Sequence, residues 1–149
     1  MNRDFQSANK ASREKMRKLI ESMSDKELAL PTVAGWTIAS TLAHVAFWDY
    51  RILYLLNHWK ENEIAPSPYD VDAINEAHKP LCLALPPRSA AQLALQAADA
   101  IDTAIENTPD DLVEKILAAK VQFKFERNVH RENHLKEIEE ALVREGRKL

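Results

Sequence analysis

The apolar residues of this chain recur every three to four positions over four long stretches, and this periodicity constrains the fold more than any other feature. In residues 38–60, for example, Leu42, Val45 and Trp48 fall on one side of a helix drawn at about 100° per residue. The polar and apolar alternation that is typical of strands is nearly absent, and only 2 of the 149 residues are glycine. The sequence therefore predicts an almost entirely helical protein.

Four long helices follow from this pattern. They are predicted at about residues 3–22, 38–60, 88–106 and 122–145. Most of the connections between them are short, and no repeat or low-complexity tract interrupts them. Because each helix must bury its apolar face against another, we expect an all-α, antiparallel four-helix bundle that forms one domain over residues 1–149.

The connections carry capping and breaking residues. Thr37 stands where a hydroxyl can cap the second long helix, and Asp70 can cap a short helix over residues 71–79. We expect Pro80 to end that short helix, because proline donates no backbone hydrogen bond and crowds the preceding turn. Over residues 110–120 the pattern allows either a short helix or an irregular crossing.

Composition narrows the class of protein. The formal net charge is −3 and the isoelectric point is near 6.0, which argues against nucleic acid as a partner. No apolar stretch is long enough to span a bilayer, so no membrane partner is expected. Cys82 is the only cysteine, which favours a cytoplasmic location and excludes an intrachain disulfide. We interpret Cys82 as a small buried hydrophobic residue.

The segment NVHRENHLKEIEE (residues 128–140) places His130 and His134 four positions apart. On a helix this spacing separates the two side chains by about 40° and their Cβ atoms by roughly 6 Å, so both rings can reach one metal ion. Phe123 and Ile138 lie on the same helix face, which turns the pair toward the bundle interior. The alternative interpretation is a solvated polar face.

His44 is the natural third ligand. It lies near the start of the second long helix, at the border of the apolar arc, with Trp48 one turn further on. Metal and cofactor sites in bundles use side chains on facing helices. The alternative is a core histidine that bonds to a backbone carbonyl. His58 and His78 have no supporting pattern and are expected at the surface or in loop packing.

Two segments together resemble the DinB/YfiT-like helical bundle superfamily. They are GWTIASTLAHVAFWDYRI (residues 35–52) and HRENHLKEIEEAL (residues 130–142), and VDAINEAHKPL between them is also similar. The resemblance covers nearly the whole chain. In that family, one histidine of the second helix and an H-x-x-x-H pair of the last helix bind a divalent metal, commonly nickel or zinc. The resemblance therefore implies that His44, His130 and His134 are metal ligands.

Three neutral imidazoles leave at least one coordination position open for water or a small-molecule substrate. A metal held in this way can lower the pKa of bound water or hold a thiol as its thiolate. Related thiol-dependent S-transferases imply a low-molecular-weight thiol, such as bacillithiol or mycothiol, that is transferred to an electrophile. Metal-assisted hydrolysis is a second possible reaction. The competing class is a non-enzymatic metal-binding or stress-responsive bundle that acts as a structural or interaction protein.

Further residues are candidates for the same site. Glu137 shares the face of the histidine pair, where it can orient a ligand, act as a base or bind metal, and the alternative is a solvated glutamate. Arg127 and Arg51 are placed to reach an anionic substrate or thiol carboxylate, and the alternative is ordinary surface ion pairs. Trp36 and Trp48 are expected to pack in the core, where Trp48 can also wall the metal pocket.

Two expectations concern geometry and assembly. If a metal binds at nitrogen distances near 2.1 Å, the three imidazoles should converge within about 4 Å of a common point. Bundles of this kind often associate through a helix face, so a homodimer is a further prediction.

Overall fold

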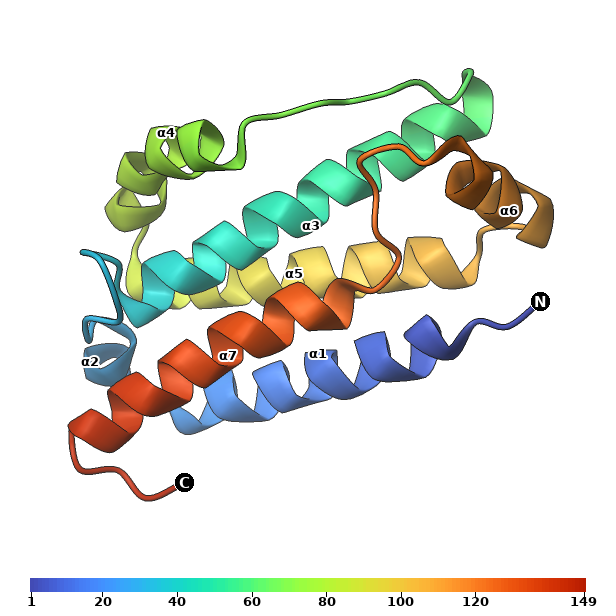
Figure 1. Cartoon of the computed structure of the whole chain (residues 1–149). Coiled ribbons are helices and arrows are strands. Elements are labelled where there is room, and N and C mark those ends of the chain that lie inside the picture. Colours follow the sequence, from blue (N-terminus) through green and yellow to red (C-terminus); the bar gives the residue numbers. More distant parts are fainter.

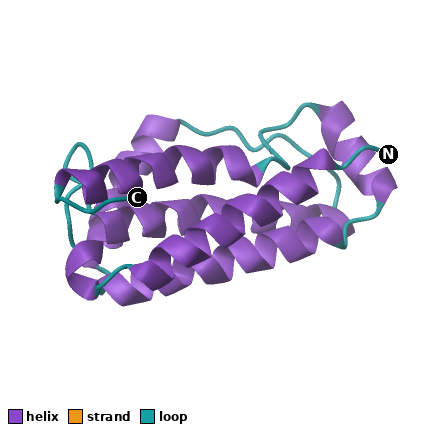
Figure 2. Cartoon of the chain, turned by 90° about the horizontal axis from the view of Figure 1, so that it is seen from below, coloured by secondary structure: helices purple, strands orange, loops and turns teal.

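Seven helices and no strand make up the protein, and a computed structural model describes all of residues 1–149 (Figures 1 and 2). The long helices are α1 (Asp4–Ser22), α3 (Ile38–Glu61), α5 (Pro87–Glu106) and α7 (Arg127–Arg144), and the short ones are α2 (Asp25–Leu28), α4 (Val71–Ala84) and α6 (Asp110–Ala119). The four long helices lie side by side and cover most of the chain. The predicted all-α four-helix bundle is confirmed.

The long helices form two pairs that run in opposite directions. Figure 1 shows α1 and α7 running one way and α3 and α5 the other. Helices α3 and α5 are parallel and pack closely, because residues 62–70 and α4 first carry the chain back along α3. A second return, over residues 120–126, leads from α6 to the start of α7.

The helix starts follow their capping residues. Thr37 and Ser40 cap α3 reciprocally, each side-chain oxygen accepting a bond from the other's backbone N–H. The Asp70 carboxylate caps α4, as predicted. The expected end of this helix at Pro80 is wrong, because α4 continues to Ala84. Pro80 and the residue one turn before it are exposed, so water can bond the carbonyl that the proline leaves unpaired.

The start of the last helix also differs from the prediction. Helix α7 begins at Arg127, and residues 122–126 are irregular. Phe123 and Phe125 drive this difference, because their rings pack edge to face at 4.7 Å and close the end of the core. Residues 110–119 form a helix, which decides between the two predicted alternatives.

The core consists of two apolar clusters with a charged layer between them. One cluster surrounds the first half of α3 and the other surrounds its second half. Between them lie Asp49, Asp102, Arg127 and Arg131, which we call the ionic layer. Its members are buried, and Arg131 and Asp49 are both 0% exposed. No helix is both long and apolar enough to cross a membrane.

Candidate metal centre

Helices α3 and α7 bring His44, His130 and His134 together, and we call these three residues the histidine centre. The Nε2 atom of His130 lies 3.3 Å from that of His44 and 3.1 Å from that of His134. One ligand nitrogen of each ring lies within 4.8 Å of the others. Three atoms so placed are all within about 2.8 Å of a common point, inside the predicted 4 Å.

These separations suit a metal. Two nitrogens bound to one ion at about 2.1 Å are about 3.0 Å apart at right angles and about 3.4 Å apart in a tetrahedron. The distances of 3.1 and 3.3 Å lie within that range. The geometry therefore matches neighbouring ligands of one ion.

A hydrogen-bonded relay fixes the proton on His44. The Nδ1 atom of His78 lies 2.6 Å from the carbonyl oxygen of Ile74, which can only accept, so this Nδ1 carries the proton. In the neutral ring, Nε2 of His78 is then an acceptor, and Nδ1 of His44 donates to it at 2.9 Å. The Nε2 atom of His44 is consequently left with a free lone pair that faces the other two histidines.

Glu137 does the same for His134. Its carboxylate accepts the Nδ1–H of His134 at 2.9 Å, and in the neutral ring this leaves the lone pair on Nε2. Histidines that bind metal usually donate their second nitrogen to a carboxylate or carbonyl in this way. Glu137 is one-third exposed, and this bond gives it a positioning role that a merely solvated glutamate does not have.

The electrostatics of the centre favour a cation. Burial, followed by the charges of His134 and His44, lowers the pKa of His130 to about 2. Burial, followed by His134 and His78, lowers the pKa of His44 to about 3. Both rings are therefore neutral at pH 7, as metal binding requires. The Nε2 atoms of His44 and His134 both approach Nε2 of His130, and either a proton on His130 or a cation can bridge them, so the residues fit a divalent ion.

The Nδ1 atom of His130 is enclosed and has no hydrogen-bond partner. His44 and His134 each have a fixed second nitrogen, whereas the orientation of His130 depends on packing and on what its Nε2 atom faces. A bound ion would therefore restrict the orientation of His130 more than that of His44 or His134.

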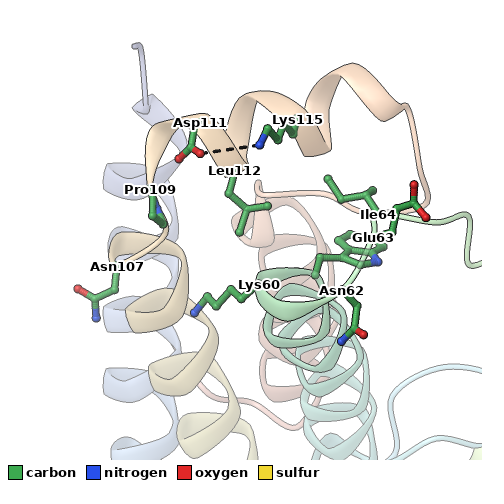
Figure 3. Close-up of a pocket in the computed structure, with 10 residues that line it drawn as sticks. Lys60, Asn62, Glu63, Ile64, Asn107, Pro109, Asp111, Leu112 and Lys115 are labelled. Atoms are coloured by element: carbon green, nitrogen blue, oxygen red, sulfur yellow. Dashed lines mark ion pairs between the residues drawn. The ribbon is translucent and has the colours of Figure 1, made fainter.

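Two cavities open on the histidine centre. One, of about 560 Å³, is reached by all three rings and walled by Trp48, as predicted, and we call it the histidine cavity. The other, of about 310 Å³, meets His44 and His134 on their opposite side and includes Glu137. A third cavity, of about 720 Å³, lies where α3 and α5 end and contains no histidine (Figure 3). An ion pair within α6, between Asp111 and Lys115, lies at its edge.

Arg127 and Arg51 both line the histidine cavity. Arg127 is buried, and its Nε–H donates to the Asp49 carboxylate at 2.8 Å. Arg51 donates to the backbone oxygens of Ser67 and Gln122 at 2.8 and 3.1 Å. The alternative of ordinary surface ion pairs is wrong for both, because one is buried and the other pairs with no carboxylate.

The prediction for His78 is also wrong. Its side chain is buried against His44, not placed at the surface or in loop packing. A signal was present in the sequence: Ile74, His78 and Cys82 are spaced four apart, which places them on one side of α4. Cys82 is buried, as predicted, and burial raises its pKa to about 11.

The pattern of the DinB superfamily matches residues 8–138 of this chain, which is most of its length and includes every histidine described above. The chain belongs to the DinB superfamily. No curated protein and no solved structure matches it. Membership agrees with the helical bundle, and the histidine centre lies within the matched residues.

Proposed function

We propose that this DinB-superfamily protein binds a divalent metal, nickel or zinc, through His44, His130 and His134 and transfers a low-molecular-weight thiol to an electrophile. The observation that carries the proposal is the convergence of three imidazole nitrogens beside a cavity of about 560 Å³. A divalent ion held by three imidazoles acts as a Lewis acid and lowers the pKa of a thiol or water that enters from the cavity.

The surrounding residues prepare this site. His78 and Glu137 hold the rings of His44 and His134 with their lone pairs toward the common point, so little reorganisation is needed on binding. Trp48 walls the cavity and is itself held by a bond from its Nε1–H to the Asn75 side chain at 3.0 Å. These contacts keep the shape of the site.

The reaction is a substitution. A thiol R–SH and an electrophile R′–X give R–S–R′, X⁻ and a proton. The sulfur lone pair forms the new S–C bond while the leaving group departs with the electrons of the C–X bond, and the thiol proton passes to water. Superfamily membership and the open side of the centre support this reaction. With water as nucleophile, the same residues would support hydrolysis.

Metal content is the first test. Protein without an affinity tag is stripped with a chelator and incubated in turn with nickel, zinc and manganese, and the bound metal is measured. We expect about one equivalent in the parent and in His58→Ala, because His58 is exposed and remote from the centre. We expect under a tenth of an equivalent in His130→Ala and His44→Ala. A parent that binds under a tenth of an equivalent of every metal contradicts the proposal.

The second test is the reaction. Metal-loaded protein is assayed with cysteine or glutathione and 1-chloro-2,4-dinitrobenzene, and with a nitrophenyl ester for hydrolysis. Conjugation should depend on the metal and fall to the uncatalysed rate in His130→Ala, with His58→Ala again the control. A protein that binds metal but accelerates neither reaction would support the non-enzymatic bundle and overturn the proposed activity.

A further inference from the structure

The histidine cavity carries positive charge that its own walls do not balance. Arg51, Lys124 and Arg127 line it, and no aspartate or glutamate does. The nearest carboxylate to Arg127 is Asp49, which lies behind it and also accepts bonds from Arg131. Asp49 is therefore shared by Arg127 and Arg131, although Arg131 also pairs with Asp102, and the side of Arg127 toward the cavity faces no carboxylate.

The outer end of Arg127 has no partner in the protein. This residue is only 6% exposed, and its single side-chain hydrogen bond is made by Nε. Its two terminal nitrogens make none. Four side-chain nitrogen or oxygen atoms in the protein are fully enclosed and have no hydrogen-bond partner, and none of them belongs to Arg127. Its terminal nitrogens are therefore not fully enclosed, and they reach open space in the cavity that Arg127 lines. Two parallel N–H donors are thus available, which is the geometry that binds a carboxylate in a bidentate manner.

Arg51 adds to this charge. Its guanidinium is over the Tyr69 ring at 4.4 Å and bonds only to neutral oxygens of Ser67 and Gln122. Burial lowers its pKa, and the charge of Arg127 acts in the same direction, whereas Tyr69 opposes it. Arg51, which has no carboxylate partner, therefore lies in the same electrostatic neighbourhood as Arg127, whose partner Asp49 is shared with Arg131.

The remaining walls of the cavity are largely apolar. Apart from the polar Asn75 and Gln122, they are formed by Trp48, Ile52, Tyr69, Val71, Val121 and Phe123. A ligand that fits this lining has an apolar body and an anionic group, because the apolar walls favour the body and the cationic side chains favour the anion. The volume of about 560 Å³ is that of an ordinary small-molecule site.

We propose that the histidine cavity binds a small carboxylic acid with an aromatic or aliphatic body, and that the terminal nitrogens of Arg127 hold its carboxylate. The body lies against Trp48 and Phe123, and the other end of the molecule faces the histidine centre. This inference specifies the substrate class of the proposed function. It rests on that function only for the role of the end of the molecule that faces the histidine centre.

The test compares an acid with its neutral counterpart. Binding of 3-phenylpropanoate and 3-phenylpropanamide to the wild-type protein is measured by titration calorimetry at pH 7.5 and low salt. We expect the acid to bind at least tenfold more tightly, because only the acid can pair with the Arg127 fork. Equal affinity for the two compounds, or tighter binding of the amide, overturns the inference without any variant.

A variant locates the carboxylate. In Arg127→Lys the single ammonium can still pair with Asp49, so the fold is preserved, but no free fork remains. We expect it to bind the acid at least tenfold more weakly than wild type and to lose the preference for acid over amide. Arg17→Lys, a matched change on α1 outside the cavity, should bind as wild type does. An unchanged affinity in Arg127→Lys contradicts the inference.

Chelation separates this inference from the proposed function. If Arg127 holds the carboxylate, metal-free protein keeps its preference for the acid and its sensitivity to Arg127→Lys. If binding disappears on chelation and Arg127→Lys behaves as wild type, the metal holds the carboxylate, so the inference fails while the metal proposal stands. If no metal binds but the acid is still preferred, the proposed function fails and the inference stands.

Discussion

His44 and His134 each use one ring nitrogen to face the common point and the other to hold the ring in place. The partner of His44 is His78, and the partner of His134 is Glu137. Such outer contacts decide which nitrogen carries the proton, and therefore whether the inner nitrogen can bind a metal at all. At this scale, a residue that never touches the ion can control its affinity.

Replacing His78 tests this dependence. His78→Phe keeps an aromatic ring against Phe47 but removes the acceptor for the Nδ1–H of His44. We expect zinc affinity, measured by competition with a chromophoric chelator, to fall about 10- to 100-fold. His78→Gln, whose amide oxygen can accept the same bond, should recover part of the loss.

The control for that measurement is His58→Phe, which makes the same substitution at an exposed histidine. An affinity for zinc that is equal in His78→Phe and wild type would mean that packing against Trp36 alone orients His44.

The histidine pair of α7 was predictable from sequence because helical angles depend only on spacing along one element. The placement of His44 beside that pair was predicted from its position at the border of the apolar arc of the second long helix, and the resemblance to a family supported it. The role of His78 was not predictable, because it depends on how α4 lies against α3, and residues 44 and 78 meet only in the folded chain. The spacing of His78 from Ile74 and Cys82 indicates a shared helix face, but it does not indicate which residue of another helix that face meets.

At the scale of elements, α4 lies outside the four long helices and packs on α3 (Figure 1). Its exposed side includes Pro80 and Leu81, and its buried side includes His78 and Cys82. The helix continues past Pro80 because the backbone carbonyl that loses its helical hydrogen bond faces solvent. The buried side holds His78 against His44, so the docking of α4 and the geometry of the histidine centre depend on each other.

The reactivity of Cys82 reports on that docking. Burial raises its pKa to about 11 from an ordinary 9.0. At pH 8 the thiolate fraction is then about 100-fold smaller than in the unfolded chain, because each unit of pKa above the pH reduces it tenfold. We expect dithionitrobenzoate to modify the native protein at least 100-fold more slowly than the urea-unfolded protein, and the native rate to rise with pH up to about 11.

Protein unfolded in urea provides the internal reference for this thiol. A native rate at pH 8 that equals the unfolded rate would show that α4 leaves α3 readily and that Cys82 is not held in the core.

At the scale of the whole molecule, the ionic layer joins all four long helices. Arg131 of α7 forms bonds of 2.8 to 3.2 Å with Asp49 of α3, Asp102 of α5 and the backbone of Asn9 in α1. Burial alone lowers the pKa of Arg131, and the two carboxylates outweigh it, so the net pKa is raised and the guanidinium stays charged. The layer lies between two apolar clusters, where an unpaired charge is costly.

Removal of Arg131 should therefore be severe. Arg131→Met leaves Asp49 and Asp102 buried without their main cation, and we expect the free energy of unfolding in urea, followed by circular dichroism, to fall by about 3–5 kcal/mol. Arg17→Met, which removes an exposed arginine that pairs with Asp99, should cost under about 1 kcal/mol. A loss below about 1 kcal/mol in Arg131→Met would show that the layer adds no net stability.

The bundle itself was predictable because apolar residues at helical spacing appear in every long helix, and burial of one face leaves few alternatives. The ionic layer was not, because Asp49, Asp102 and Arg131 look like solvated charges when each helix is read alone. Their partners are separated by tens of residues, and only the arrangement of helices brings them together. The direction of α5 likewise depends on the long connection before it.

The connection between α3 and α5 shapes both the bundle and the histidine cavity. The return from the end of α3 to the start of α5 is what makes these helices parallel, and it also supplies Tyr69, Asn75 and His78 around the histidine centre. The histidine centre therefore belongs to α3 and α7, whereas part of the cavity wall belongs to the connection between α3 and α5. Exchange of Tyr69, Val71 or Asn75 would therefore alter the wall of the cavity while His44, His130 and His134 keep their places on α3 and α7.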